Sequence, residues 1–149
     1  MTHIRTTHVG SLPRSQEVTD FLFSKEKNQA YNATHFDEVM KKHVDLIVSR
    51  QKDCGIDIVS DGETSKISYA TYVKDRYTGF SGDSPRNAPA DLIMFPTFLQ
   101  RLADSGGTPE YTRPMCTGEV KPLSNSELKK DISNLKSAIK KYDNIHGFM

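Results

Sequence analysis

The sequence has 149 residues, enough for one domain with a hydrophobic core of ordinary size. Twenty basic and nineteen acidic residues leave a formal net charge of +1, which gives no indication of binding to nucleic acid or to an anionic membrane. No apolar run approaches the roughly 20 residues of a membrane span, and the N-terminus lacks the apolar segment of a signal peptide. These features predict a cytoplasmic protein.

The chain opens with a short extended run that ends at a glycine. Residues 6–9 favour a β-strand, and Gly10 and Pro13 end it. In the following loop, the Ser11 hydroxyl, free backbone N–H groups and the Arg14 guanidinium are groups that hold a carboxylate or a phosphate. The alternative interpretation is an ordinary polar loop with a surface arginine.

The stretch 56–63 organises the rest of the chain. Its apolar, β-branched beginning ends abruptly in Asp61, Gly62 and Glu63. This pattern is typical of a buried parallel strand that delivers a carboxylate to its C-terminal end, so Glu63 is a candidate functional residue. The alternative is that Asp61 and Gly62 form only a tight turn and that Glu63 is a charge at a helix N-terminus.

A long helix is predicted between these two strands. Apolar residues recur with a period near 3.6 from 36 to 48. Thr34 fits the N-cap position, with Asp37 and Glu38 in a first turn where the helix dipole favours negative charge. Gly55 fits the C′ position beyond the helix end.

The order of strand, long helix and strand predicts parallel pairing. The two loops that carry Ser11 and Glu63 would then lie on the same rim of the sheet. Such loops suit the two ends of an amino acid, because Glu63 would take the ammonium group and the loop around Ser11 would take the carboxyl group.

The second half of the chain predicts further helices and short strands. Apolar spacing indicates helices over 67–77, 92–102 and 128–142. Pro96 should start or kink the second of these helices, and Ser124 with Glu127 predicts a capping box for the third. A surface loop is expected over 81–90, a strand or hairpin over 113–120, and the opening of another strand over 145–149.

The two cysteines and one histidine are expected to be structural. Cys54 and Cys116 lie far apart, with no Cys or His near them at metal-binding spacing. A reducing cytoplasm disfavours a disulfide, so we expect both to be buried as small hydrophobic residues. His43, near the edge of the long helix's apolar stripe, is expected to be a structural histidine with its hydrogen bonds satisfied.

Three motifs together resemble the catalytic domain of cobalamin-independent methionine synthase. They are the run from Thr6 to Arg14, then Gln51 with the run from Gly55 to Glu63, then Arg113-Pro114 with Gly118-Glu119-Val120 and a helix leading to Gly147-Phe148-Met149. The chain is most similar to the shorter proteins of this kind that consist of that domain alone. The resemblance implies an α/β fold of (β/α)8 TIM-barrel type, of which residues 1–149 form a partial barrel, about the first half, without a second domain.

The resemblance also implies a methyltransferase of the 5-methyltetrahydropteroyltriglutamate–homocysteine S-methyltransferase type. In that family zinc activates the thiol of homocysteine, and a methylated folate donates the methyl group. Gly10, Ser11 and Glu63 would then bind the amino-acid part of homocysteine, with Arg14 and Asp61 as further candidates.

The family's zinc ligands come from a His-x-Cys motif and a later Glu and Cys in the second half of the barrel. This sequence contains no His-x-Cys, so no metal ligand and no catalytic residue is assigned, and 110–113 is only a vague counterpart of the family's folate-binding residues. We expect a truncated domain that carries the amino-acid half of the site, does not transfer methyl groups by itself, and self-associates through its open barrel edge.

Other functions fit the same residues. Epoxyalkane–coenzyme M transferases share the opening motifs, but Glu63 would repel the sulfonate of coenzyme M. A non-catalytic amino-acid-binding or assembly module would keep Ser11 and Glu63 without the metal chemistry. An unrelated α/β domain with chance matches is the remaining alternative.

Overall fold

The computed structural model describes residues 3–84, 89–104 and 113–149. The sequence-based expectations for 105–107 as a helix end and for 110–112 near a folate site lie outside these residues. The helices and strands follow one another as α1 (Gln16–Glu26), α2 (Ala33–Asp53), β1 (Ile58–Val59), α3 (Tyr69–Arg76), β2 (Phe80–Ser81), α4 (Ala90–Met94), α5 (Pro96–Asp104), β3 (Met115–Cys116), α6 (Ser126–Ile139) and β4 (His146–Gly147).

A small parallel sheet brings together residues near the start and residues near the end of the chain. β1 pairs in parallel with β4, with Ile58 opposite His146 and Val59 opposite Gly147. On its other edge, Ile58 forms a parallel bridge with Thr7. The predicted parallel pairing of the first two extended segments is therefore confirmed, as is the strand near the C-terminus.

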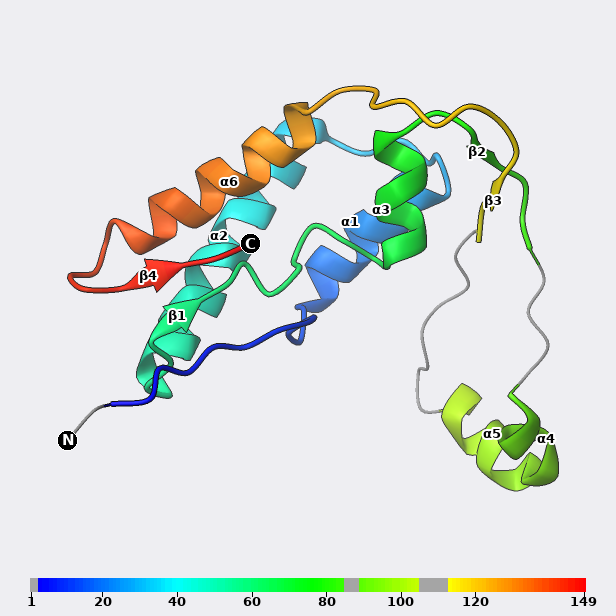
Figure 1. The fold of residues 1–149 in the computed structure, drawn as a ribbon, viewed down its shortest axis with the longest axis horizontal. Coiled ribbons are helices and arrows are strands. Elements are labelled where there is room, and N and C mark those ends of the chain that lie inside the picture. The colour runs from blue at the N-terminus through cyan, green and yellow to red at the C-terminus, as the bar shows by residue number, and fades with distance from the viewer. Residues whose placement is uncertain (1–2, 85–88, 105–112) are drawn as a thin grey trace.

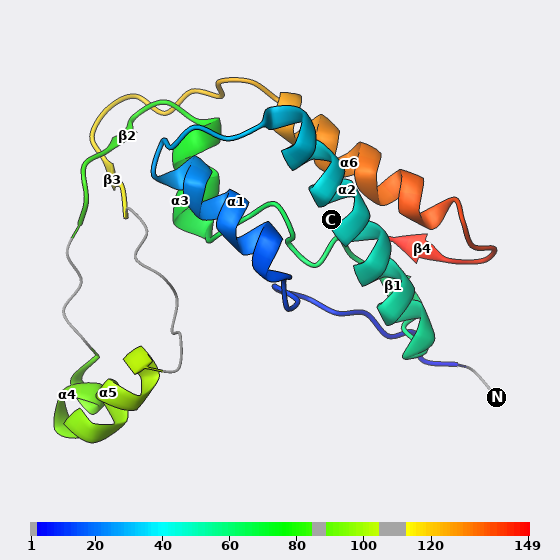
Figure 2. The same ribbon diagram turned by 180° about the vertical axis from the view of Figure 1, so that it is seen from behind.

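Two helices pack side by side against this sheet, α2 and α6 (Figure 1). The view from behind shows the same pair, with α1 and α3 beside them (Figure 2). The arrangement is mixed α/β, as predicted, but the described residues form no closed barrel. The reason is that only three short extended segments lie in the parallel sheet, whereas barrel closure needs a continuous ring of strands.

Among the described residues the hydrophobic core consists of two clusters, and α2 contributes to both. The first joins α1 to the N-terminal half of α2 through Val18, Leu22, Phe36, Val39 and Met40. The second joins the C-terminal half of α2 to β1 and α6 through Val44, Val48, Val59, Leu135 and Ala138. The predicted apolar stripe of the long helix is thus the centre of the core.

The start of α2 differs from the prediction. Asn32, rather than Thr34, is the N-cap, and its side chain accepts a hydrogen bond from the backbone N–H of His35 at 3.1 Å. Asparagine is a better N-cap than threonine, so the helix begins earlier, and its first turn contains no acidic residue. Its end is as predicted, because Gly55 follows the C-cap with a φ of +78°.

The predicted capping box of α6 does not form. The N-cap is Asn125, without a side-chain hydrogen bond, and the Ser124 hydroxyl instead contacts Ser126. Glu127, the acidic residue of the expected box, forms an ion pair with Lys25 of α1 at 3.1 Å. A tertiary ion pair has replaced the local contact.

Between α3 and α6, the described elements β2, β3, α4 and α5 lie on an arm separate from the parallel sheet (Figures 1 and 2). β2 and β3 pair antiparallel within it, which confirms a strand within 113–120, and Ser81 belongs to β2 rather than to a loop. Pro96 is the first residue of α5, so it starts a helix, as expected. The helix expected over 92–102 is accordingly split into α4 and α5.

The prediction that both cysteines are buried is wrong. Cys54 is exposed just beyond α2, and Cys116 is exposed in the two-stranded arm. Both positions lie outside the two core clusters, and sequence composition alone did not indicate this. Separately, none of the helices in the described part of the chain combines the length and the hydrophobicity needed to cross a membrane.

The N-terminal segment is attached to β1 through Asp57. The Asp57 carboxylate accepts hydrogen bonds from the Thr6 backbone N–H at 2.7 Å and the Thr6 hydroxyl at 3.0 Å, and it lies 2.8 Å from Nε2 of His3. The Thr6 N–H and the His3 ring lower the pKa of Asp57 from 3.8 to about 2. The ionised carboxylate therefore holds the first extended segment beside β1.

Replacing Asp57 by Asn is expected to lower the free energy of unfolding near neutral pH and to have little effect near pH 2. Because the folded-state pKa lies below the unfolded value of 3.8, the stabilisation is present above pH 3.8 and is lost as the pH falls toward 2. Urea unfolding of both proteins across this range measures the difference. A difference that does not change with pH would contradict the assignment.

Candidate functional site

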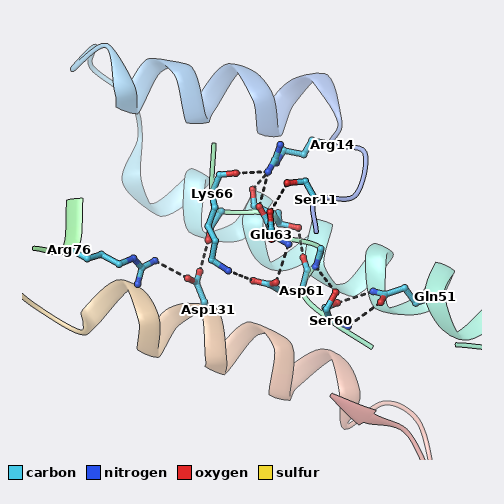
Figure 3. Close-up of polar contacts among 12 residues, drawn as sticks. Ser11, Arg14, Gln51, Ser60, Asp61, Glu63, Lys66, Arg76 and Asp131 are labelled. Atoms are coloured by element: carbon cyan, nitrogen blue, oxygen red, sulfur yellow. Dashed lines mark hydrogen bonds and ion pairs between the residues drawn. The ribbon is translucent and has the colours of Figure 1, made fainter. Parts of the chain in front are cut away.

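Two loops meet at the carboxyl end of the parallel sheet, one after the first extended segment and one after β1. The Ser11 hydroxyl donates a hydrogen bond to Oε2 of Glu63 at 2.6 Å (Figure 3). Close by, the Leu12 backbone N–H donates to the Gly62 carbonyl oxygen at 3.0 Å. The structure thus brings together the two side chains that the sequence predicted on one rim.

The turn after β1 has an unusual backbone. Gly62 has a φ of +62° and Glu63 a φ of +54°, so two consecutive residues lie in the left-handed region. The Asp61 carboxylate accepts the backbone N–H of Glu63 at 3.0 Å, and the Thr64 hydroxyl donates to the Asp61 carbonyl oxygen at 2.7 Å. Hydrogen bonds within the turn stabilise a conformation that a glutamate rarely adopts.

Gly62 leaves no room for a side chain. A Cβ atom there would lie 2.9 Å from Cγ2 of Ile47 and 3.0 Å from Cβ of Leu12. Gly10 also has a positive φ, +102°, but a Cβ there would meet nothing within 4 Å. Open space therefore lies beside the Ser11 loop, whereas the Glu63 turn is packed against α2.

Substituting Gly62 by Ala is expected to lower the free energy of unfolding by about 1–3 kcal/mol, from backbone strain and overpacking together. Gly10→Ala is the matched control, because it adds backbone strain without the contacts to Ile47 and Leu12. Denaturant unfolding should give a larger loss for Gly62→Ala. Equal losses would mean that packing against α2 does not hold the turn.

Arg14 binds the backbone of the Glu63 turn. Its Nε donates to the Thr64 carbonyl oxygen at 3.2 Å, and its Nη2 donates to the carbonyl oxygens of Glu63, at 2.8 Å, and of Lys66. Burial lowers the pKa of Arg14, while the negative charges of Glu63 and Asp61 raise it. Arg14 thereby ties the Ser11 loop to the Glu63 turn.

Asp61 is the buried acidic residue of the site. Its carboxylate forms an ion pair with Nζ of Lys66 at 3.1 Å (Figure 3). Lys66 balances this buried charge. The carboxylate that lies beside the Ser11 hydroxyl is that of Glu63.

Three residues that contact the site or its supports were not predicted from the sequence as part of the site. The side chain of Gln51 bonds the backbone of Ser60, and Asp131 of α6 accepts a hydrogen bond from the Ser65 hydroxyl at 2.8 Å (Figure 3). His43 is buried, which lowers its pKa, and it hydrogen-bonds the backbone of Pro13. In each case a polar residue on the buried face of an amphipathic helix was the available signal.

The residues present do not fit the zinc ion that the sequence resemblance implied. Within the described ranges, no group of three or more His, Cys, Asp or Glu side chains is arranged to hold a metal ion. The two cysteines, which would be the preferred soft ligands, are exposed on separate elements.

An α/β protein with a hydroxyl and a carboxylate at the carboxyl ends of parallel strands has the architecture of a small-molecule binding site. Residues 4–84 match the catalytic domain of the cobalamin-independent synthases, and the chain belongs to this family. The matched region contains both loops of the candidate site.

Similar proteins are named 5-methyltetrahydropteroyltriglutamate–homocysteine methyltransferase. The one from Desulforamulus reducens is 29% identical over 75 residues, which is 50% of this chain and 10% of the relative. Those from Corynebacterium glutamicum and Neisseria gonorrhoeae are 23% and 26% identical, and each match covers 85% of this chain and 19% of the relative. The chain thus spans a fifth or less of the length of the curated relatives it matches.

Proposed function

We propose that this chain supplies the amino-acid-binding loops of a methionine synthase-like methyltransferase, with homocysteine as the methyl acceptor. The observation that carries this proposal is the 2.6 Å hydrogen bond between Ser11 and Glu63, which joins at one rim the two loops that the family resemblance assigns to the amino-acid part of homocysteine. Family membership and the names of the relatives support the choice of homocysteine.

The chemistry of the two loops suits the two charged ends of an amino acid. The Glu63 carboxylate would accept the ammonium group, and the backbone around Gly10 with the Ser11 hydroxyl would donate to the carboxylate. Before binding, the Ser11–Glu63 hydrogen bond keeps both groups oriented. On binding, the Ser11 hydroxyl is free to turn to the ligand's carboxylate as the ammonium group takes its place on Glu63.

Arg14 and Asp61 belong to this proposed site as supporting residues. Arg14 is engaged with three carbonyl oxygens of the turn, and Asp61 with Lys66 and the Glu63 N–H. The remaining chemistry of the reaction, namely thiol activation by zinc and methyl donation by a folate, is assigned to no residue of this chain, because the described residues do not form a zinc site.

The negative charge of Glu63 favours homocysteine over coenzyme M as the methyl acceptor. A sulfonate carries a negative charge, and Arg14, the cation of the Ser11 loop, is already bound to backbone carbonyls. An amino-acid thiol is therefore the better fit than a sulfonate thiol.

Replacing Glu63 by Gln is expected to weaken homocysteine binding by about 2–5 kcal/mol, because the ammonium group would lose its charged partner. Isothermal titration under reducing conditions, with and without added zinc, measures the dissociation constant. The matched control is Glu38→Gln, at an exposed position on α2, which should bind as the unaltered protein does. Equal affinity of the Glu63 and Glu38 variants would remove Glu63 from the site, and no binding by the unaltered protein would contradict the proposed function.

We propose further that the chain self-associates through the edge of its parallel sheet. Among the described residues, β4 pairs with β1 alone, which leaves its other edge unpaired, and Phe148 and Met149, which follow β4 in the chain, are 43% and 45% exposed. An unpaired strand edge with apolar neighbours favours pairing with another chain.

Light scattering after gel filtration tests this self-association. A concentration-dependent mass above the 16.8 kDa of one chain is expected, and Phe148→Lys should reduce it, because a charge beside an edge strand opposes pairing. Leu123→Lys, at an exposed apolar position away from the sheet, is the matched control. A mass of one chain at all concentrations would contradict the proposal.

A further inference from the structure

Gln51 lies in the last turn of α2 and is only 4% exposed. Its side-chain Nε2 donates hydrogen bonds to the carbonyl oxygens of Ser60 at 2.8 Å and of Ile47 at 3.2 Å. Its Oε1 accepts the backbone N–H of Ser60 at 3.0 Å. Both hydrogen atoms and the oxygen of this amide are therefore directed at backbone groups (Figure 3).

The Gln51 amide takes the place of a neighbouring strand at Ser60. The sheet pairing of β1 ends at Val59, whose carbonyl oxygen accepts the backbone N–H of Phe148 at 2.9 Å. The next residue, Ser60, is buried and exchanges an N–H and a C=O hydrogen bond with Gln51, in the way that paired residues of a sheet do. Buried backbone groups need such partners, so the amide lets the strand end there.

Ser60 is directly connected to the turn that presents Glu63. The Ser60 hydroxyl accepts the backbone N–H of Gly62 at 3.2 Å, and Gly62 in turn accepts the Leu12 N–H. A shift of Ser60 would therefore move both the left-handed turn and its contact with the Ser11 loop.

We propose that Gln51 is a positioning residue, which fixes Ser60 so that the following turn presents the Glu63 carboxylate to the Ser11 hydroxyl. The expected effect on homocysteine binding rests on the proposed function. The effect of Gln51 on the position of the turn does not depend on it. Gln51 would touch no ligand and would act only through Glu63.

Few other side chains could replace the Gln51 amide. Glutamate has nearly the same shape, but it would place a carboxylate oxygen against the carbonyl oxygens of Ser60 and Ile47 in a buried site. Methionine keeps the volume and adds no charge, but it loses all three hydrogen bonds.

The test compares Gln51→Glu and Gln51→Met with Thr71→Val. Thr71 is also buried, and its hydroxyl bonds the backbone of Ser68 at the start of α3, so its loss destabilises the fold without touching the Glu63 turn. The binding readout is the ratio of dissociation constants for homocysteine and for 4-sulfanylbutanoic acid, which lacks the amino group. The second readout is backbone amide hydrogen exchange at Ser60, Gly62 and Glu63.

Both Gln51 variants are expected to reduce the preference for homocysteine by about tenfold or more, because a displaced carboxylate no longer meets the ammonium group. They should also accelerate exchange at the three amides, whereas Thr71→Val should change neither. If Gln51→Glu does not fold, the comparison is made between Gln51→Met and Thr71→Val alone.

Two results would overturn the inference: an unchanged preference in a folded Gln51 variant, or amide exchange no faster than in Thr71→Val. If the unaltered protein shows no preference for homocysteine, the proposed function fails, and amide exchange alone decides whether Gln51 holds the turn.

Discussion

The left-handed turn after β1 is the constraint on which the candidate site depends. Gly62 and Glu63 both have positive φ, and Gly62 packs against Ile47 and Leu12 with no room for a Cβ atom. A non-glycine residue in this region costs roughly 1–2 kcal/mol, which surrounding contacts have to offset. Those contacts come from three parts of the chain: Asp61 within the turn, Arg14 from the loop after the first extended segment, and Gln51 from α2 before it.

The long helix α2 connects this turn to the rest of the fold. Its N-terminal half packs on α1, and its C-terminal half packs on β1 and α6. Ile47 and Gln51, one turn apart near the end of the same helix, contact Gly62 and Ser60. The hydrophobic core and the polar site are therefore coupled through one rigid element, and a change in helix packing would be transmitted to Glu63.

Residues 4–84, the part of the chain that matches the family, include every residue named above that holds the turn. They do not include α6. The helix α6 contributes Asp131, which accepts hydrogen bonds from Ser65 at 2.8 Å and from Arg76 at 3.0 Å. The turn is thus also held from the side remote from Arg14 (Figure 3). By contrast, α4 and α5 lie on an arm away from the site, and Phe95 and Phe98 there are exposed.

Sequence patterns predicted the long helix α2, the parallel order of the first strands and the position of Ser11 and Glu63 on one rim, because periodicity, glycine positions and a strand–helix–strand order are readable from the sequence itself. Two cap assignments failed, since Asn32 and Thr34 compete within one turn and Glu127 is drawn to Lys25. The exposure of the cysteines, the engagement of Arg14 with three carbonyl oxygens and the role of Gln51 were decided by tertiary structure. The exposure of the cysteines depends on where the segments pack, and the contacts of Arg14 and Gln51 depend on which distant backbone groups that packing brings within hydrogen-bonding range.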